Sequence, residues 1–215
     1  MKTEKQKIIQ RLLLLRILAQ DENIWGNLKL QKQVFLNELA LIKSNFGGLY
    51  YKYFRYQLGP FSADLAADFQ WVANTGLAHK TTYKVTDRGQ YLVDFVDGTI
   101  GDYKNNSQIL KLIDKTTARY TPYDGQKLMK LVYQLALPPE DTPGTEVKIE
   151  KMPTFMDILS PERHTFKCEF QIPPSTLEDI KDELGYNEDQ ERKLKKKLPT
   201  LLAQSGKRLR ESLSS

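Results

Sequence analysis

Residues 59–89 read GPFSADLAADFQWVANTGLAHKTTYKVTDRG, and this stretch contains the signals that decide the fold. The opening Gly-Pro pair marks a turn, and Ser62 stands where its hydroxyl can cap the first turn of a helix. Apolar residues line one face of the segment that follows, and Gly76 then acts as a helix terminator. Residues 82–86 alternate as a strand would, and Asp87 begins a further helix.

Two helices and an aromatic segment are predicted before this stretch. Residues 3–20 and 28–43 carry apolar side chains at three- and four-residue intervals, the spacing of an amphipathic helix, with Asn27 as the N-cap of the second. Residues 49–57 are dense in tyrosine, which favours a strand or a short buried segment. The order of elements is helix, helix, a third helix ending in Gly-Leu, a short strand and a Tyr-x-hydrophobic-Thr-x-x-Gly turn. This order is typical of winged-helix domains.

Helices and one strand are also predicted on the C-terminal side. Residues 107–118 and 123–137 read as two more helices, and the proline pair that follows ends the second of them. Residues 139–152 combine proline, glycine and acids, which predicts a linker or a surface hairpin. Residues 166–172 alternate as a strand would, and Ser175 is expected to cap a helix that leads toward a Lys/Arg-rich tail.

The predicted fold class is therefore mainly α, with a small β component (α+β). Residues 1–138 are expected to form a winged-helix-like helical domain with a small β-wing, and residues 139–152 a linker. Residues 153–215 are expected to form a C-terminal strand–helix extension that ends in a basic helical tail.

The composition excludes several classes of protein. Hydrophobic residues make up 40% of the chain and charged residues 27%, with a net charge of +5, which is ordinary for a water-soluble globular protein. The apolar run Leu12–Leu15 is broken by Arg16, so it is too short for a membrane span of about 20 residues or for a secretory signal. The single cysteine, Cys168, excludes a disulfide framework and a Cys-rich zinc site. These features predict a cytoplasmic protein with no membrane segment.

Signals for catalysis, metals and cofactors are weak. His164 and Cys168 have an even spacing that places them on one face of a strand, but a buried structural cysteine is the favoured interpretation. Glu146-Val147-Lys148 matches the E-x-K element of metal-dependent nucleases, yet the conceivable second carboxylate, Asp124, stands at a helix start. The sequence has no Gly-rich phosphate loop and no His-x3-His spacing. We therefore expect no enzymatic activity, no catalytic residue, no metal and no cofactor.

Several motifs resemble those of the Panacea, or SocA-like, antitoxin domain and of its uncharacterised bacterial relatives. Leu28-Lys29-Leu30-Gln31-Lys32 resembles the family's K-L-Q-K signature, and the hydrophobic stretch that follows it is present at residues 34–36. Tyr56-Gln57-Leu58-Gly59-Pro60 resembles the aromatic-x-x-Gly-Pro motif, and residues 128–133 resemble a later Leu-x-x-hydrophobic-Tyr helix. The resemblance covers about residues 5–138. It departs from the family at Gln33, where a small apolar residue is usual, and at Phe54-Arg55, where a tryptophan is common.

The resemblance implies a helical domain that binds and neutralises a partner toxin, and some relatives instead deliver a partner to a protease. The candidate partner-binding or motif residues are Lys29, Gln31, Lys32, Tyr56, Gly59, Pro60, Asp64 and Asp68. The three polar residues of the K-L-Q-K motif are expected to lie outside the core. There they either bind a partner or hydrogen-bond the Tyr56–Pro60 turn, and the second role is favoured because Gln31 can satisfy buried backbone groups.

A winged-helix domain also allows a second hypothesis, a DNA-binding transcriptional regulator. Its third helix and wing would supply the possible nucleic-acid contacts Gln70, Asn74, Lys80, Lys84 and Arg88. The third helix, however, has Asp64 and Asp68 and no Lys or Arg, and carboxylates repel phosphates. The basic tail adds Lys195, Lys196 and Lys197, which suit nucleic acid, an acidic protein groove or a solvated helix face. We therefore favour a non-catalytic protein that binds and restrains a partner protein.

Overall fold

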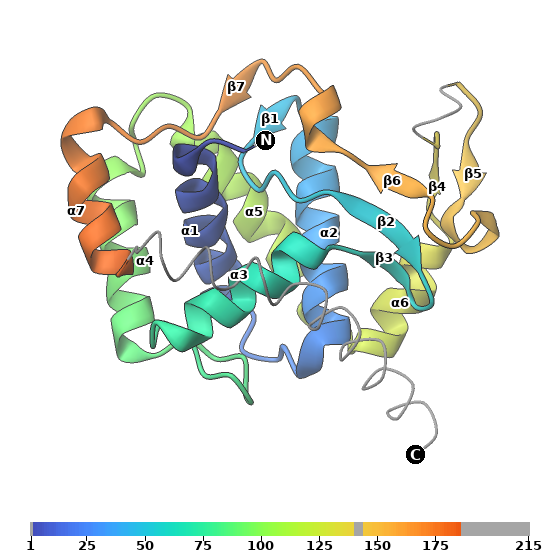
Figure 1. Cartoon of the computed structure of the whole chain (residues 1–215), viewed down its shortest axis with the longest axis horizontal. Coiled ribbons are helices and arrows are strands. Elements are labelled where there is room, and N and C mark those ends of the chain that lie inside the picture. The colour runs from blue at the N-terminus through green and yellow to red at the C-terminus, as the bar shows by residue number, and fades with distance from the viewer. Residues whose placement is uncertain (1, 140–143, 186–215) are drawn as a thin grey trace.

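Two central helices organise the protein. The computed structural model describes residues 2–139 and 144–185, and it is mainly helical with small sheets at one side (Figure 1). Helix α1 (Glu4–Gln20) begins with a capping box: the Thr3 hydroxyl accepts from the N–H of Gln6, whose side chain accepts from the N–H of Thr3. Helix α2 (Gly26–Lys43) has Trp25 at the N-cap without a side-chain hydrogen bond. The predicted Asn27 cap is wrong, because Asn27 already lies inside the helix.

Helices α1 and α2 are buried on all sides, which corrects the prediction of two amphipathic helices. Every residue from 8 to 15 is buried in α1, and every residue from 29 to 39 is buried in α2. Helices α3 (Ala63–Asn74), α4 (Asp87–Ile100) and α5 (Asn106–Tyr120) pack around α1. Helix α2 packs against α5, α6 (Gly125–Tyr133) and the strands. Polar residues of both helices therefore enter the interior along with the apolar ones.

The segment that decides the fold forms the predicted helices, with a small hairpin between them. Ser62 caps α3 by accepting from the N–H of Leu65, and Gly76 ends the helix at a φ of +77°. The predicted β-wing contains a single bridge, between Ala78 and Val85. Gly89 in the first turn of α4 packs closely on this hairpin, since a Cβ there would lie 2.1 Å from the carbonyl oxygen of Leu77.

The helix predicted over residues 123–137 is too long. Helix α6 ends at Tyr133, and β4 (Ala136–Leu137) then pairs with β5 (Val147–Lys148) in an antiparallel hairpin that continues into the short helix η1 (Ile149–Lys151). The proline pair after β4 cannot continue a helix, and strand pairing with β5 satisfies the backbone before it instead. Residues 139–152 were predicted to form either a linker or a surface hairpin, and the described residues among them belong to a hairpin.

The C-terminal residues complete sheets that the N-terminal residues begin. Strand β6 (Asp157–Leu159) pairs with β2 (Tyr53–Tyr56), which in turn pairs with β3 (Gly59–Phe61). The strand predicted over residues 166–172 is reduced to β7 (Cys168–Glu169), which pairs in parallel with β1 (Phe46–Gly47). The short helix η2 (Pro161–Arg163) lies between β6 and β7.

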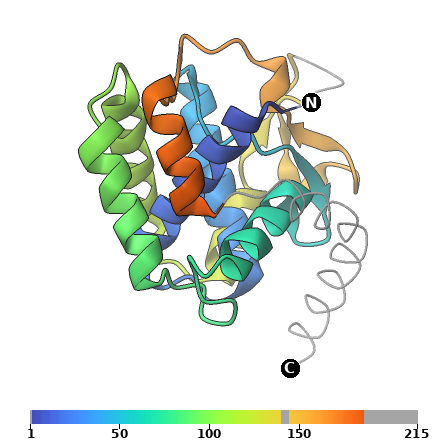
Figure 2. The same cartoon turned by 60° about the vertical axis from the view of Figure 1, so that its left-hand side comes forward.

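Helix α7 (Pro174–Leu184) lies beside α1 and α4 (Figure 2). Lys181 pairs with Glu4 of α1 at 2.6 Å, and Arg88 of α4 donates to the carbonyl of Glu183. The predicted Ser175 cap is wrong: Pro173 is the N-cap residue, and Ser175 lies in the first turn of α7. Proline at the first helical position needs no N–H partner, so this helix starts without a side-chain cap. Within the described ranges, no helix has the length and apolar character that a bilayer crossing requires.

Candidate partner-binding surface

The K-L-Q-K motif lies inside the protein, where Gln31 and Lys32 hydrogen-bond the backbone of β3 and of the residue that follows it. The Gln31 amide donates to the Ser62 carbonyl at 3.0 Å and accepts from the Ser62 N–H at 2.9 Å. Lys32 Nζ donates to the Pro60 carbonyl at 2.8 Å. The expectation that these side chains lie outside the core is wrong, since each is no more than 2% exposed. They are buried because the backbone beside β3 faces α2 and takes its hydrogen-bond partners from that helix.

Lys29 points to a different part of the protein. Its Nζ lies 3.0 Å from the carboxylate of Asp21 and donates to the Thr121 carbonyl at 2.9 Å. Both members of the ion pair are buried. Lys29 therefore ties the α1–α2 loop to the end of α5, and its side chain has no open face on which a partner could bind.

The two carboxylates of α3 differ in their surroundings. Asp64 is half exposed and pairs with Lys2 at 2.7 Å. Asp68 is buried and accepts hydrogen bonds from Gln10, from Arg11 at 2.8 Å and from the Tyr51 hydroxyl at 3.1 Å. The argument that both carboxylates repel phosphates therefore fails for Asp68, because Arg11 compensates its charge and the side chain is not at the surface.

An aromatic surface lies on the outer face of the β3–β2–β6 sheet. Strand alternation turns Tyr53 inward, where its ring packs on Phe35, and places Phe54 and Tyr56 on the opposite face. We define the aromatic surface as Phe54, Tyr56, Phe61 and Phe155, whose neighbouring ring centroids lie 5.6–6.0 Å apart. Phe61 forms the buried base, whereas Phe155 is 68% exposed. Such spacing is typical of favourable aromatic contacts.

Phe155 holds its ring outward from an unfavourable backbone conformation. Its φ is +69°, in the left-handed region that costs a non-glycine residue about 1–2 kcal/mol. Its N–H donates to the Arg55 carbonyl at 2.6 Å, which fixes the loop before β6 against β2. An exposed phenylalanine in a strained conformation contributes little to folding, so a role in binding is the natural hypothesis for it.

A shallow hollow adjoins the aromatic surface. It lies between the first turns of α2 and the β2–β3 turn, and it encloses about 220 Å³ including its open mouth. Its lining includes Leu28, Gln31, Lys32, Tyr56, Gly59 and Phe61. The hollow therefore brings together four of the eight candidate residues from the sequence: Gln31, Lys32, Tyr56 and Gly59. Lys29 and the α3 carboxylates lie elsewhere.

One basic group, Lys32, lines this hollow, and a second, Arg55, lies next to Tyr56 in β2 outside the lining. Burial, together with the positive charge of Arg55, lowers the pKa of the Lys32 amine to about 7. Arg55 is half-buried, donates to the Ile149 carbonyl at 3.2 Å and lies over the Tyr133 ring at 5.0 Å. Among residues 2–139 and 144–185, no carboxylate forms an ion pair with Lys32 or Arg55.

The possible nucleic-acid contacts are spread over α3, the hairpin and α4. Asn74, Lys80 and Lys84 are exposed, and Gln70 is half-buried. Arg88 is exposed, but its guanidinium donates to the carbonyls of Thr75 and Glu183, where it links α3 to α7. The predicted contacts Lys195, Lys196 and Lys197 lie outside the described residues.

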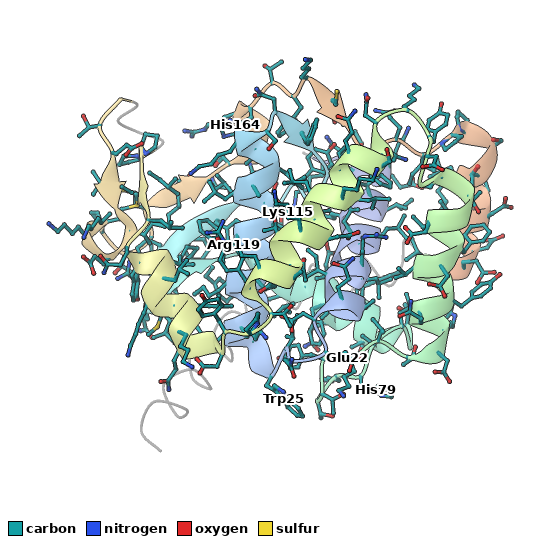
Figure 3. The ribbon with its side chains drawn as sticks, turned by 180° about the vertical axis from the view of Figure 1, so that it is seen from behind. Glu22, Trp25, His79, Lys115, Arg119 and His164 are labelled. Atoms are coloured by element: carbon teal, nitrogen blue, oxygen red, sulfur yellow. The ribbon has the colours of Figure 1, made fainter. Side chains whose placement is uncertain are left out.

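The residues considered for catalysis do not form the predicted arrangements. His164 ends η2 and lies outside β7, so it does not share a strand with Cys168, and the expectation of a buried cysteine is wrong because Cys168 is half-buried. His79 and His164 lie at opposite ends of the molecule (Figure 3). Asp124 caps α6 by accepting from the N–H of Lys127, and Lys148 of the E-x-K element donates to the side chain of Gln134. Throughout the described part of the chain, no three His, Cys, Asp or Glu residues gather as a metal site would require. Compared with protein-family models, curated proteins and solved structures, the chain matches none of them.

Proposed function

We propose that this chain is a non-catalytic binding protein, antitoxin-like, that binds and restrains a partner protein through the aromatic surface. The exposed ring of Phe155 is the observation that carries the proposal, because it is held outward at a cost in backbone strain. Aromatic side chains that are packed together and partly exposed are enriched at the centres of protein interfaces. The antitoxin part of the proposal rests on the K-L-Q-K and Gly-Pro motifs, and the partner is a toxin or another effector.

In this proposal the K-L-Q-K residues do not contact the partner but support the aromatic surface from the interior. Gln31 fixes the backbone of Ser62 after β3, Lys32 fixes that of Pro60 in β3, and the turn that joins β2 and β3 is held next to Tyr56 by this pairing. A rigid turn lowers the entropy that a binding surface loses when a partner docks.

The alternative is a winged-helix regulator that binds DNA. Lys80 and Lys84 are exposed in the hairpin after α3, and Lys115 and Arg119 are exposed on α5 (Figure 3). These cations support contact with phosphates. Against it, α3 has no Lys or Arg to offer to base edges, and we therefore rank this function second.

Phe155→Gly is expected to weaken partner binding by at least about 30-fold, or about 2 kcal/mol, since it removes an exposed aromatic anchor. The tagged wild-type and variant chains are purified from the cells that make the protein, with nuclease present, and retained proteins are quantified by mass spectrometry. Affinity is then measured with the recovered partner. Glycine relieves the strain at this position, so the urea midpoint of the variant should shift by less than the equivalent of about 1 kcal/mol.

Tyr91→Ala is the matched control, because Tyr91 is a 54% exposed aromatic on α4, away from the aromatic surface (Figure 1). It should retain the partner at the wild-type level. A partner that stays bound to Phe155→Gly contradicts the proposal. Nucleic acid recovered without nuclease, together with no retained protein, favours the DNA-binding alternative.

A further inference from the structure

The hollow beside the aromatic surface contains a buried amine without an acidic partner. Lys32 is 2% exposed, and its one hydrogen bond within the described ranges is the one donated to Pro60. An ammonium group has three donors, so the protonated side chain has capacity left for a further acceptor. Buried lysines are normally paired, because desolvation of an isolated charge is costly. This amine is therefore incompletely satisfied by its own chain.

A second cation lies close to the first. The positive charge of Arg55 contributes to the lowered pKa of Lys32. Arg55 lies over the Tyr133 ring, and Gly59 lies between that ring and Lys32. A Cβ added at Gly59 would come within 3.4 Å of the Tyr133 ring and 3.7 Å of Lys32 Nζ. Two neighbouring cations repel each other, and an arriving carboxylate would relieve that repulsion for both.

The size of the hollow limits what can enter it. The hollow is shallow, and the space that the protein itself encloses there is about that of one water molecule, far below the usual 300–1,000 Å³ of pockets for small molecules and cofactors. It suits the polar end of a single side chain, with the rest of a peptide segment lying across its mouth. Nucleic acid is a poor match, since its phosphates favour a row of exposed cations, whereas Lys32 is buried and Arg55 is half-buried.

We infer that the hollow binds an acidic segment of the protein partner, in which an Asp or Glu side chain is adjacent to an apolar residue. The carboxylate approaches Lys32 and Arg55, and the apolar neighbour packs on Tyr56 and Phe61. This inference rests on the proposed function and specifies the chemistry of its partner. A carboxylate at the amine also favours the charged form of Lys32, so the pair forms in a desolvated place where charge pairs are strong.

The probe is a library of random twelve-residue peptides displayed on phage and selected on the immobilised full-length chain. Selected peptides are synthesised with a fluorophore and titrated by anisotropy. We expect selected peptides to share a carboxylate next to an aromatic or aliphatic residue. Replacing that carboxylate by its amide should weaken binding at least about tenfold, as for a charge-assisted hydrogen bond in a desolvated place.

Two variants test the residues assigned to the carboxylate. Lys32→Met and Arg55→Gln should each weaken the acidic peptide by about tenfold while leaving the amide peptide unchanged, so the difference between the two peptides shrinks. Lys52→Gln is the matched control, because Lys52 is a cation next to the same sheet and is paired with Asp157 at 2.7 Å. Urea denaturation shows whether Lys32→Met alters the fold. If it does, Arg55→Gln alone tests the inference.

Several results overturn the inference. The first is a selection that yields no peptides, or only peptides without carboxylates. The second is an affinity difference between the acidic and the amide peptide that is the same in Arg55→Gln as in the wild type. The third is a single-stranded oligonucleotide that competes for binding as well as the acidic peptide does. Failure of the proposed function gives a different result: the partner then remains bound to Phe155→Gly. Loss of the partner in Phe155→Gly with full retention in Arg55→Gln overturns only the acidic-segment inference.

Discussion

Asp68→Ala is expected to lower the free energy of unfolding by about 3–5 kcal/mol, the range for removing one partner of a buried charge pair. The substitution removes the buried carboxylate that pairs with Arg11, and with it the acceptor of the Gln10 amide and the Tyr51 hydroxyl. Asp68 thus joins α3 to α1 and to the aromatic segment before β2, and the substitution removes this shared contact. Urea denaturation followed by far-UV circular dichroism measures the change.

Asp64→Ala supplies the internal comparison. Asp64 is on the same helix and pairs with Lys2, but its side chain is 48% exposed, so its removal should cost no more than about 1 kcal/mol. Equal losses for the two variants would contradict the assignment of Asp68 to a buried pair. In a binding experiment, a variant that includes Asp68→Ala can lose the partner because the fold is damaged. Loss of the partner in Asp64→Ala alone reports on a surface contact.

Lys29→Ala is expected to be similarly damaging, by about 3–5 kcal/mol in the free energy of unfolding. The change leaves the Asp21 carboxylate buried without its cation, and it removes the hydrogen bond to the Thr121 carbonyl that joins the α1–α2 loop to α5. The same denaturation measurement applies. Lys127→Ala is the control, since Lys127 is exposed and 4.0 Å from Asp124, and its loss should be within about 0.5 kcal/mol of zero.

A double-mutant cycle separates the ion pair from general packing at this place. Lys29→Met with Asp21→Asn removes both charges while keeping side chains of similar size. The amide oxygen introduced by Asp21→Asn can still accept from the N–H of Asn23, as the Asp21 carboxylate does. The combined loss should be smaller than the sum of the single losses by about 1–3 kcal/mol. Strict additivity would show that Lys29 and Asp21 stabilise the protein independently of each other.

Local signals in the sequence were sufficient to predict α3 and α4. Ser62 accepts from the N–H of Leu65, three residues away, and Gly76 ends α3 through its own φ, so both signals act within one helical turn. The hydrogen bonds from Gln31 and Lys32 to the backbone near the Gly-Pro turn are not local, and they were expected only because the two motifs were paired and buried backbone groups need partners. The burial of these side chains was not predictable, because it depends on β3, α5 and α6 covering α2 from different directions.

The candidate binding surface depended on contacts that the sequence does not display. Phe155 meets Phe54 and Tyr56 because β6 pairs with β2, which lies far earlier in the chain. Arg55 was noticed only where the Panacea resemblance departs from its pattern. It lies in the same region as Lys32 because α2 packs on β3, which pairs with β2.

The sequence by itself determined where α3 begins and ends and where α4 begins, since caps, terminators and apolar spacing act between neighbouring residues. Only the tertiary structure decided which polar side chains are buried and which aromatic rings are exposed. Asp68 is neutralised by Arg11 from a different helix, and Phe155 is supported by a strand distant in sequence. Burial and charge compensation are sums over all neighbours in space, and those neighbours are set by the packing of the whole chain.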